Sequence, residues 1–217
     1  MALQHTDKVS VILMASGFSR RFGGGKKLLF PFRGKPLARY VLDLVCGMNE
    51  SSHCFSGIFF VAADKEVAAL AEGLPVTLIR NTAPEKDIRE SVRLGVEAAC
   101  KTGYYFFFPC DQPLLDQETV RLILAARKPG YIAEPCFKDS GDSTESRNSQ
   151  GSRVCQGSPS LFSSVFRDEL LNLSEGEKPR VIKARHPEAL ISVEITNRLA
   201  LFDIDTPEDA LGLAHGN

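Results

Sequence analysis

The sequence predicts a three-layer α/β fold in which a mostly parallel sheet is covered by helices on both faces. Short apolar runs rich in β-branched and aromatic residues alternate along the chain with amphipathic segments of helix length. Strands that are apolar throughout are typical of a parallel sheet buried on both faces, and the intervening helices supply right-handed crossovers. The 217 residues, 43% of them hydrophobic, are enough for one core. We therefore expect a single domain over residues 1–217 with a Rossmann-like arrangement.

The apolar runs and the amphipathic runs place the expected elements along the chain. The strand candidates are residues 9–15, 57–63, 75–79 and 104–109, with weaker ones at 131–135 and 190–195. The helix candidates are residues 36–46, 65–72, 88–101, 117–127 and 163–173.

Residues 139–153 interrupt this alternation. The segment DSGDSTESRNSQGSR contains no hydrophobic residue. It cannot bury enough apolar surface to offset the entropy lost on ordering, so we expect a mobile surface loop there.

Composition narrows the class of partner. The formal net charge is -1 and the pI is about 6.4, so the basic excess of a nucleic-acid-binding protein is missing and a small anionic substrate fits better. No signal-peptide pattern and no apolar run of about 20 residues is present. The six cysteines contain no CxxC pair, which favours reduced thiols. We expect a soluble, cytoplasmic protein that binds neither membrane nor nucleic acid.

A glycine-rich basic loop follows the first strand, within residues 14–27 (MASGFSRRFGGGKK). Glycines let a backbone approach a ligand closely, successive N–H groups form an anion-binding concavity, and arginine and lysine bind phosphate. Neither the Walker A pattern nor GxGxxG is present. The alternative is a flexible basic loop without a ligand. Its position after the first strand favours phosphate binding, because ligands bind at the carboxyl ends of the strands in such sheets.

Two further segments are candidates for the same edge of the sheet. Asp111 directly follows the apolar run 104–109, and a carboxylate there suits Mg²⁺. The alternative is a turn-forming aspartate before Pro113. Residues 87–95 begin a helix whose N-terminus could bind an anion or a nucleotide; the alternative is ordinary capping by Asp87.

The loop resembles the signature (L/M)-A-(A/S)-G-x-S-x-R-(M/F)-G…K of the MobA-like nucleotidyltransferases, and residues 28–37 (LLFPFRGKPL) resemble its continuation. The resemblance implies that Arg21 and Lys27 hold the phosphates, with Lys26 as a substitute for Lys27 because the loop has an extra glycine. It implies nucleotide-binding positions at Ala15, Ser16, Gly17, Ser19 and Gly23.

Downstream segments match in the same order. Residues 111–114 (DQPL) resemble the family's metal-binding motif, and the helix start resembles its S-x-S-x-R-x-G segment through Ser91 and Arg93. Residues 157–162 (GSPSLF) resemble the G-(H/N)-P-x-L-F motif of the molybdenum cofactor cytidylyltransferase branch, with Ser158 as a departure. Residues 201–209 (LFDIDTPED) resemble that branch's ending. There Asp205 is a second metal candidate, and Thr206 caps the last helix.

The resemblance implies transfer of CMP from CTP to the terminal phosphate of a molybdopterin-type molybdenum cofactor, with Mg²⁺ and with release of pyrophosphate. Residues 80–84 (RNTAP) follow the third strand in place of the guanylyl branch's G-P-L-A-G-like segment, which favours CTP over GTP. The alternatives are a family member that uses GTP or a sugar 1-phosphate, and a non-catalytic carrier that delivers the cofactor to a client molybdoenzyme. The combination of Arg21, Lys27 and Asp111 favours turnover over carriage.

Overall fold

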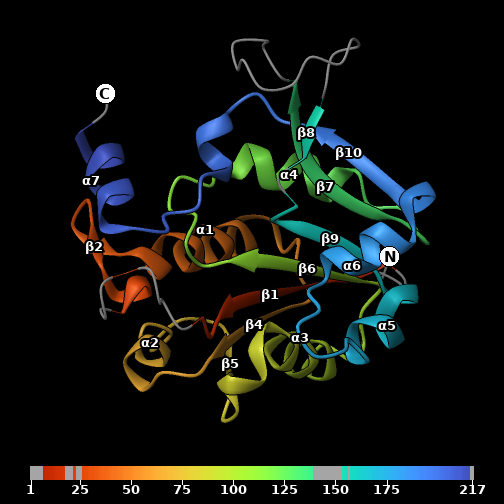
Figure 1. The fold of residues 1–217 in the computed structure, drawn as a ribbon, viewed down its shortest axis with the longest axis horizontal. Helices are drawn as coiled ribbons and strands as arrows, with labels where there is room; N and C mark the ends of the chain where they lie inside the picture. Colours follow the sequence, from red (N-terminus) through yellow and green to blue (C-terminus); the bar gives the residue numbers. More distant parts are fainter. Residues whose placement is uncertain (1–6, 18–21, 23–25, 139–152, 156, 216–217) are drawn as a thin grey trace.

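The computed structural model describes residues 7–17, 22, 26–138, 153–155 and 157–215 (Figure 1). Its helices are α1 (Leu37–Ser52), α2 (Lys65–Ala69), α3 (Asp87–Ala98), α4 (Gln117–Ala125), α5 (Arg167–Leu171), α6 (Arg180–Arg185) and α7 (Pro207–His215). Its strands are β1 (Val9–Ala15), β2 (Pro31–Phe32), β3 (Lys35–Pro36), β4 (Gly57–Ala62), β5 (Thr77–Arg80), β6 (Tyr104–Pro109), β7 (Ile132–Lys138), β8 (Arg153–Cys155), β9 (Ser160–Ser163) and β10 (Leu190–Glu194).

The main sheet has the strand order β10-β7-β9-β6-β1-β4-β5, and β8 pairs with β7 outside this path. β6, β1, β4 and β5 run parallel, and β10 runs parallel to β7. β9 lies between β6 and β7 and is antiparallel to both. The expected mostly parallel α/β sheet is therefore confirmed. The antiparallel strand β9 thus joins the two parallel portions of the sheet.

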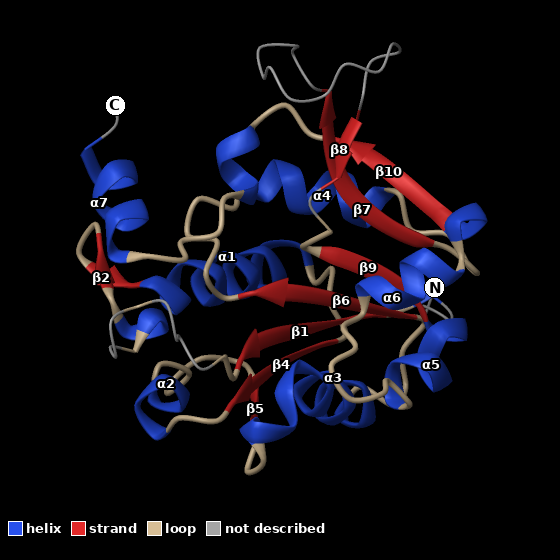
Figure 2. Ribbon diagram, viewed as in Figure 1, coloured by secondary structure: helices blue, strands red, loops and turns tan. Residues whose placement is uncertain are grey.

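Side chains of β1 alternate between the two faces of the sheet, which gives the fold its three layers (Figure 2). Val11 and Leu13 pack with residues of α1 and α4 in one apolar cluster. Ile12 packs in a second cluster with residues of α3 and α5 on the opposite face. The central strand is buried on both faces, as its continuous apolar run predicted.

One contact between the layers depends on a missing side chain. Gly95 of α3 faces β1 so closely that a Cβ atom there would lie 2.5 Å from Cγ2 of Ile12. The helix can approach the strand at this distance only because glycine has no side chain.

The structure corrects one predicted element. Residues 163–173 were expected to be a single helix, but Ser160–Ser163 form β9, and α5 begins only at Arg167 after a 3-10 turn. Ser163, the only residue shared by β9 and the expected helix, is buried and pairs with Tyr104, so pairing within the sheet outweighs the local helical pattern there. The pairing of β7 with β8 sets Cys136 opposite Cys155.

The polar segment 139–153 and the length of the helices bear on two further expectations. Of the polar segment 139–153, residues 139–152 lie outside the described residues, and Arg153 begins β8. Within the described ranges, no helix has both the length and the apolar character needed to cross a bilayer.

Candidate active site

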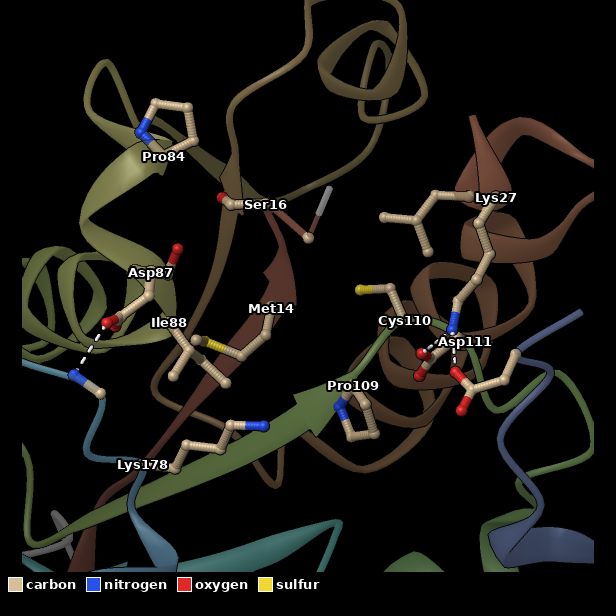
Figure 3. Close-up of a pocket in the computed structure, with 15 residues that line it drawn as sticks. Met14, Ser16, Lys27, Pro84, Asp87, Ile88, Pro109, Cys110, Asp111 and Lys178 are labelled. Carbon is tan, nitrogen blue, oxygen red and sulfur yellow. Dashed lines mark hydrogen bonds and ion pairs between the residues drawn. The ribbon is translucent and has the colours of Figure 1, made fainter. Parts of the chain in front are cut away.

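A cavity of about 630 Å³ opens at the carboxyl ends of β1 and β6 (Figure 3). Ser16 and Gly17, which follow β1, form part of its wall. Lys27 lines the cavity from the 3-10 turn Lys27–Leu29, and Asp111 and Asp205 line it from segments far apart in the sequence. The fold therefore brings these five expected site residues, together with Ser91, to one place, at the edge of the sheet where the strand order predicts a ligand.

Lys27 is the centre of the charged part of this cavity. Its Nζ lies 2.6 Å from Oδ2 of Asp111 and 2.8 Å from Oδ1 of Asp205, and its side chain is only 11% exposed. Burial by itself would lower the pKa of this ammonium group, but the two carboxylates outweigh it and raise the pKa above its ordinary value. Lys27 is therefore a fixed positive charge at neutral pH.

Lys26 faces elsewhere. Its Nζ pairs with Oδ2 of Asp64 at 2.8 Å and with Oε1 of Glu66 at 2.9 Å, and its side chain is 44% exposed. Of the two loop lysines, Lys27 is thus the one that reaches the cavity, as the resemblance implied.

Asp111 carries a carboxylate oxygen with unused bonding capacity. Its Oδ1 is buried and has no hydrogen-bond partner among the described groups. Its carbonyl oxygen accepts a hydrogen bond from the N–H of Ile204 at 3.0 Å, which ties the C-terminal segment to the end of β6. The neighbouring Cys110 is buried, and this burial raises the pKa of its thiol well above the ordinary range.

A capping box holds Asp205 in place. The N–H of Thr206 donates to Oδ2 of Asp209 at 2.8 Å, and the N–H of Asp209 donates to Oγ1 of Thr206 at 3.2 Å. The N–H of Asp205 also donates to the Asp209 carboxylate, at 3.0 Å. The predicted cap of the last helix is confirmed, and it fixes the backbone that carries Asp205.

Asp203 is a site residue that the sequence analysis missed. Its Oδ1 accepts a hydrogen bond from Nε2 of Gln112 at 2.9 Å. Burial, together with the nearby charge of Asp111, raises the pKa of Asp203 to about 6. The alternation of acidic residues in LFDIDTPED was the available signal, but only the folded chain sets Asp203 near Asp111.

Ser91 and Arg93 differ in where they lie. Ser91 lines the cavity, is buried, and accepts a hydrogen bond from Nδ2 of Asn81 at 3.0 Å. Arg93 does not line the cavity and instead pairs with Glu90 at 2.6 Å and Glu97 at 2.7 Å on its own helix. The predicted nucleotide contact of Arg93 therefore has no geometric support.

The remaining predicted loop residues can be placed as follows. Ala15 is the buried last residue of β1, and Oγ of Ser16 donates to the carbonyl oxygen of Val61 at 3.1 Å. Outside the described residues lie Ser19, Arg21 and Gly23.

A second, smaller hollow of about 350 Å³ adjoins the first and shares Met14, Ile88, Pro109 and Lys178 with it. Ser158, from the segment that resembles the G-(H/N)-P motif, lines this second hollow.

Lys183 also lines the second hollow, and it forms a buried ion pair with Glu134. Its Nζ lies 2.8 Å from Oε2 of Glu134, and it also donates to the carbonyl oxygen of Gly157 at 2.5 Å. This pair connects β7 and α6 to the 157–158 turn.

Asp111 and Asp205 are the carboxylates of the cavity that could hold a metal ion. The described residues contain no group of three or more His, Cys, Asp and Glu side chains arranged to hold a metal ion. Mg²⁺ requires less, since it usually takes one or two carboxylates together with phosphates and water. Asp111 and Asp205 both approach one point, now occupied by the Lys27 ammonium, and Oδ1 of Asp111 lacks a partner among the described groups. These residues fit Mg²⁺.

Comparison with known proteins agrees with this geometry. The chain is 27% identical to a molybdenum cofactor guanylyltransferase of Ralstonia pickettii over 96% of this chain and 97% of that protein. It is 25% identical to the nicotine blue oxidoreductase of Paenarthrobacter nicotinovorans over 92% and 93% of the two chains. A nucleotidyl transferase from Methanothermobacter thermautotroptrophicus has the same fold, with a TM-score of 0.76 and 20% identity over 95% and 96% of the two chains. Residues 11–190 match the MobA-like NTP transferase domain, and the chain therefore belongs to this nucleotidyltransferase family.

Proposed function

We propose that the protein transfers a nucleoside monophosphate from an NTP to the terminal phosphate of a molybdopterin-type molybdenum cofactor, releasing pyrophosphate. The observation that carries this proposal is the convergence of Lys27, Asp111 and Asp205 in the larger cavity. One cation and two carboxylates at the carboxyl ends of parallel strands suit a triphosphate and its counter-ion. The molybdenum cofactor acceptor is supported by the full-length similarity to a guanylyltransferase that acts on that cofactor.

The transfer needs no general base. A phosphate oxygen of the acceptor, already ionised at neutral pH, bonds to the α-phosphorus of the NTP, while the bond from that phosphorus to the oxygen bridging to the β-phosphate breaks. The electron pair leaves with pyrophosphate, so the protein must orient the reactants and stabilise charge. Lys27 stabilises charge, because its positive charge offsets the negative charge that grows on the leaving pyrophosphate.

Asp111 and Asp205 are the residues that would hold Mg²⁺. When bound, the ion would supply Lewis-acid polarisation of phosphate oxygens and neutralise their charge. The same two carboxylates bind the Lys27 ammonium in the described structure. Lys27 must therefore exchange a carboxylate contact for a phosphate contact when substrate binds. The smaller hollow, which borders on the 157–158 turn, is the proposed place of the acceptor.

Two donor nucleotides, CTP and GTP, have support. CTP is favoured by residues 80–84, where the guanylyl branch has its own segment, and Pro84 from this stretch lines the larger cavity. GTP is favoured by the names of the full-length relatives, which include molybdenum cofactor guanylyltransferases. CTP is the donor nucleotide that we propose, and GTP is the second candidate.

The test is a panel of the four common NTPs with purified protein, Mg²⁺ and molybdopterin-type cofactor, measured as pyrophosphate release and as the mass of the cofactor product. We expect turnover with CTP and a product heavier by one CMP unit. Turnover with GTP alone would correct the base and retain the transfer reaction. Cofactor binding without pyrophosphate release from any NTP would refute the transferase and favour the carrier. Asp111→Asn is the control for non-enzymatic hydrolysis.

A further inference from the structure

Lys178 lies where the two hollows meet. Of the charged side chains that line either hollow within the described residues, it alone lines both. It precedes α6, and in Figure 3 its side chain extends toward Pro109, at the carboxyl end of β6. If donor and acceptor occupy adjoining hollows, the phosphorus that changes partners lies at this junction.

The backbone that carries Lys178 is held from two sides. Oδ2 of Asp87, at the start of α3, accepts a hydrogen bond from the N–H of Gly176 at 3.1 Å. Glu177 accepts from the N–H of Ser174 at 2.9 Å and pairs with Arg185 of α6.

Asp87 itself has a φ of +63°, a conformation that costs a non-glycine residue energy and that persists only where surrounding contacts enforce it. Strain of this kind is common at functional sites, and here it occurs in a residue that lines the larger cavity.

The charge of Lys178 is not committed to another protein group that the structure describes. Lys27 is paired with two carboxylates and Lys183 with Glu134. Lys178 is exposed, and no hydrogen bond or ion pair of its ammonium group occurs among the described residues. A held backbone with an uncommitted cation at its tip is suited to meeting an anion that arrives with the substrates.

Resting on the proposed function, we infer that Lys178 is a further catalytic residue, which binds the non-bridging oxygens of the α-phosphate at the junction of the two hollows. Its ammonium donates hydrogen bonds to these oxygens as the acceptor oxygen bonds to phosphorus and the bond to the leaving pyrophosphate breaks. No proton is transferred, and the lysine stays charged throughout. The two lysines thus divide the triphosphate: Lys178 acts on the α-phosphate, and Lys27 acts on the pyrophosphate portion.

The test uses the full chain with Lys178→Ala, Lys178→Arg and Lys27→Ala, and Lys101→Ala as a matched control. Lys101 is an exposed lysine near the amino end of β6, at the opposite edge of the sheet from the site. We expect Lys178→Ala to lower kcat about a hundredfold, as removal of one preorganised donor does, with partial recovery in Lys178→Arg. Lys101→Ala should match the wild type, and melting temperatures should be alike for the Lys178 and Lys101 variants.

A binding experiment separates the two lysines without turnover. Isothermal calorimetry measures the affinity for a nucleoside monophosphate and for pyrophosphate, each in Mg²⁺ buffer. The affinity that falls should differ between Lys178→Ala and Lys27→Ala. Lys178→Ala should lose about tenfold in monophosphate affinity, in line with one charged hydrogen bond, and retain pyrophosphate binding. Lys27→Ala should lose pyrophosphate affinity and retain the monophosphate.

The inference is overturned if a folded Lys178→Ala variant retains kcat within threefold of the wild type, or if its loss falls on pyrophosphate. A wild-type protein that binds neither probe and turns over no NTP overturns the proposed function itself, so the two failures are distinguishable.

Discussion

Replacing each loop lysine by alanine is the sharpest test of the site, because Lys26 and Lys27 are adjacent, identical in charge and different in environment. Lys27 is 11% exposed and lies between Asp111 and Asp205, whereas Lys26 is 44% exposed and pairs with acidic residues at α2. General electrostatics predicts equal losses of activity for the two substitutions. A directed contact with the phosphates predicts a large loss for Lys27→Ala alone.

The magnitude follows from the burial of Lys27. Unit charges about 4 Å apart interact by about 4 kcal/mol at the effective dielectric of about 20 that suits partly buried groups. Removing one preorganised donor from a developing anion typically costs about 10²–10³-fold in rate. We therefore expect kcat/KM of Lys27→Ala to fall by about 10²–10³-fold, and that of Lys26→Ala to fall by less than about threefold, because solvent screens exposed ion pairs.

Stability should change in the same direction. Without the ammonium of Lys27, the carboxylates of Asp111 and Asp205 repel each other at a partly buried position. Breaking a fully buried pair costs about 3–5 kcal/mol. Asp205 is 38% exposed, so we expect a smaller loss of about 1–2 kcal/mol, or several degrees in Tm for a chain of this size. Mg²⁺ should restore more stability to Lys27→Ala than it adds to the wild type, because the ion no longer competes with the lysine.

The assay is pyrophosphate release at saturating acceptor and constant ionic strength, with NTP varied, alongside thermal melts with and without Mg²⁺. Equal losses of kcat/KM in both variants would refute the directed contact. A larger loss in Lys26→Ala would show that the register of the loop is wrong. A Lys27→Ala variant with no added response to Mg²⁺ would refute the shared cation position between the two carboxylates.

Three further outcomes are expected. Asp111→Asn should lower Mg²⁺-dependent kcat at least about a hundredfold with an unchanged circular dichroism spectrum, because the amide keeps the shape of the side chain and loses its charge. Gly95→Ala should destabilise the fold by about 1–3 kcal/mol in urea unfolding, since its Cβ would lie 2.5 Å from Ile12. Asp116→Ala should cost about 1 kcal/mol at pH 7, because Asp116 caps α4 through the N–H of Thr119 at 2.7 Å. Burial would raise the pKa of Asp116, but hydrogen bonds led by that from Thr119 lower it. This stability is therefore present above the unfolded pKa of about 3.9 and is lost as the pH falls through the folded pKa.

Each of these outcomes can fail in a distinct way. Retained Mg²⁺-dependent activity in folded Asp111→Asn would remove the metal assignment. A Gly95→Ala variant as stable as the wild type would show that α3 can move away from β1 at no cost. A stability difference between wild type and Asp116→Ala that does not shrink from pH 7 to about pH 3 would contradict a charged cap.

Much of the fold could be predicted from local pattern. β1 and β6 have the expected bounds, 9–15 and 104–109, because central strands that are buried on both faces read as nearly continuous apolar runs. α7 begins at Pro207 as expected, because its cap is built from residues adjacent in sequence. The placement of Lys27 and Asp111 at one edge of the sheet was expected from motifs that follow two parallel strands, although their ion pair was not.

Other features depend on contacts between distant segments, which no local pattern records. Pairing of residues 160–163 with the neighbouring strands placed Ser163, the expected first residue of a helix, at the end of an antiparallel strand. Arg93 matches a nucleotide-binding motif in sequence, yet in the fold it pairs with Glu90 and Glu97 of its own helix and does not line the cavity.

The fold class, the family and the edge of the sheet that carries the charged groups were predictable from the chain alone, because the apolar strands and the glycine-rich loop are local in sequence. The positions of Asp203 near Asp111 and of Lys178 between the two hollows emerge only in the folded chain. The physical reason is that the direction and charge environment of a side chain depend on the groups that surround it in space. Those groups come from segments far apart in the sequence, as in the contact of Lys27 with Asp205, which are 178 residues apart.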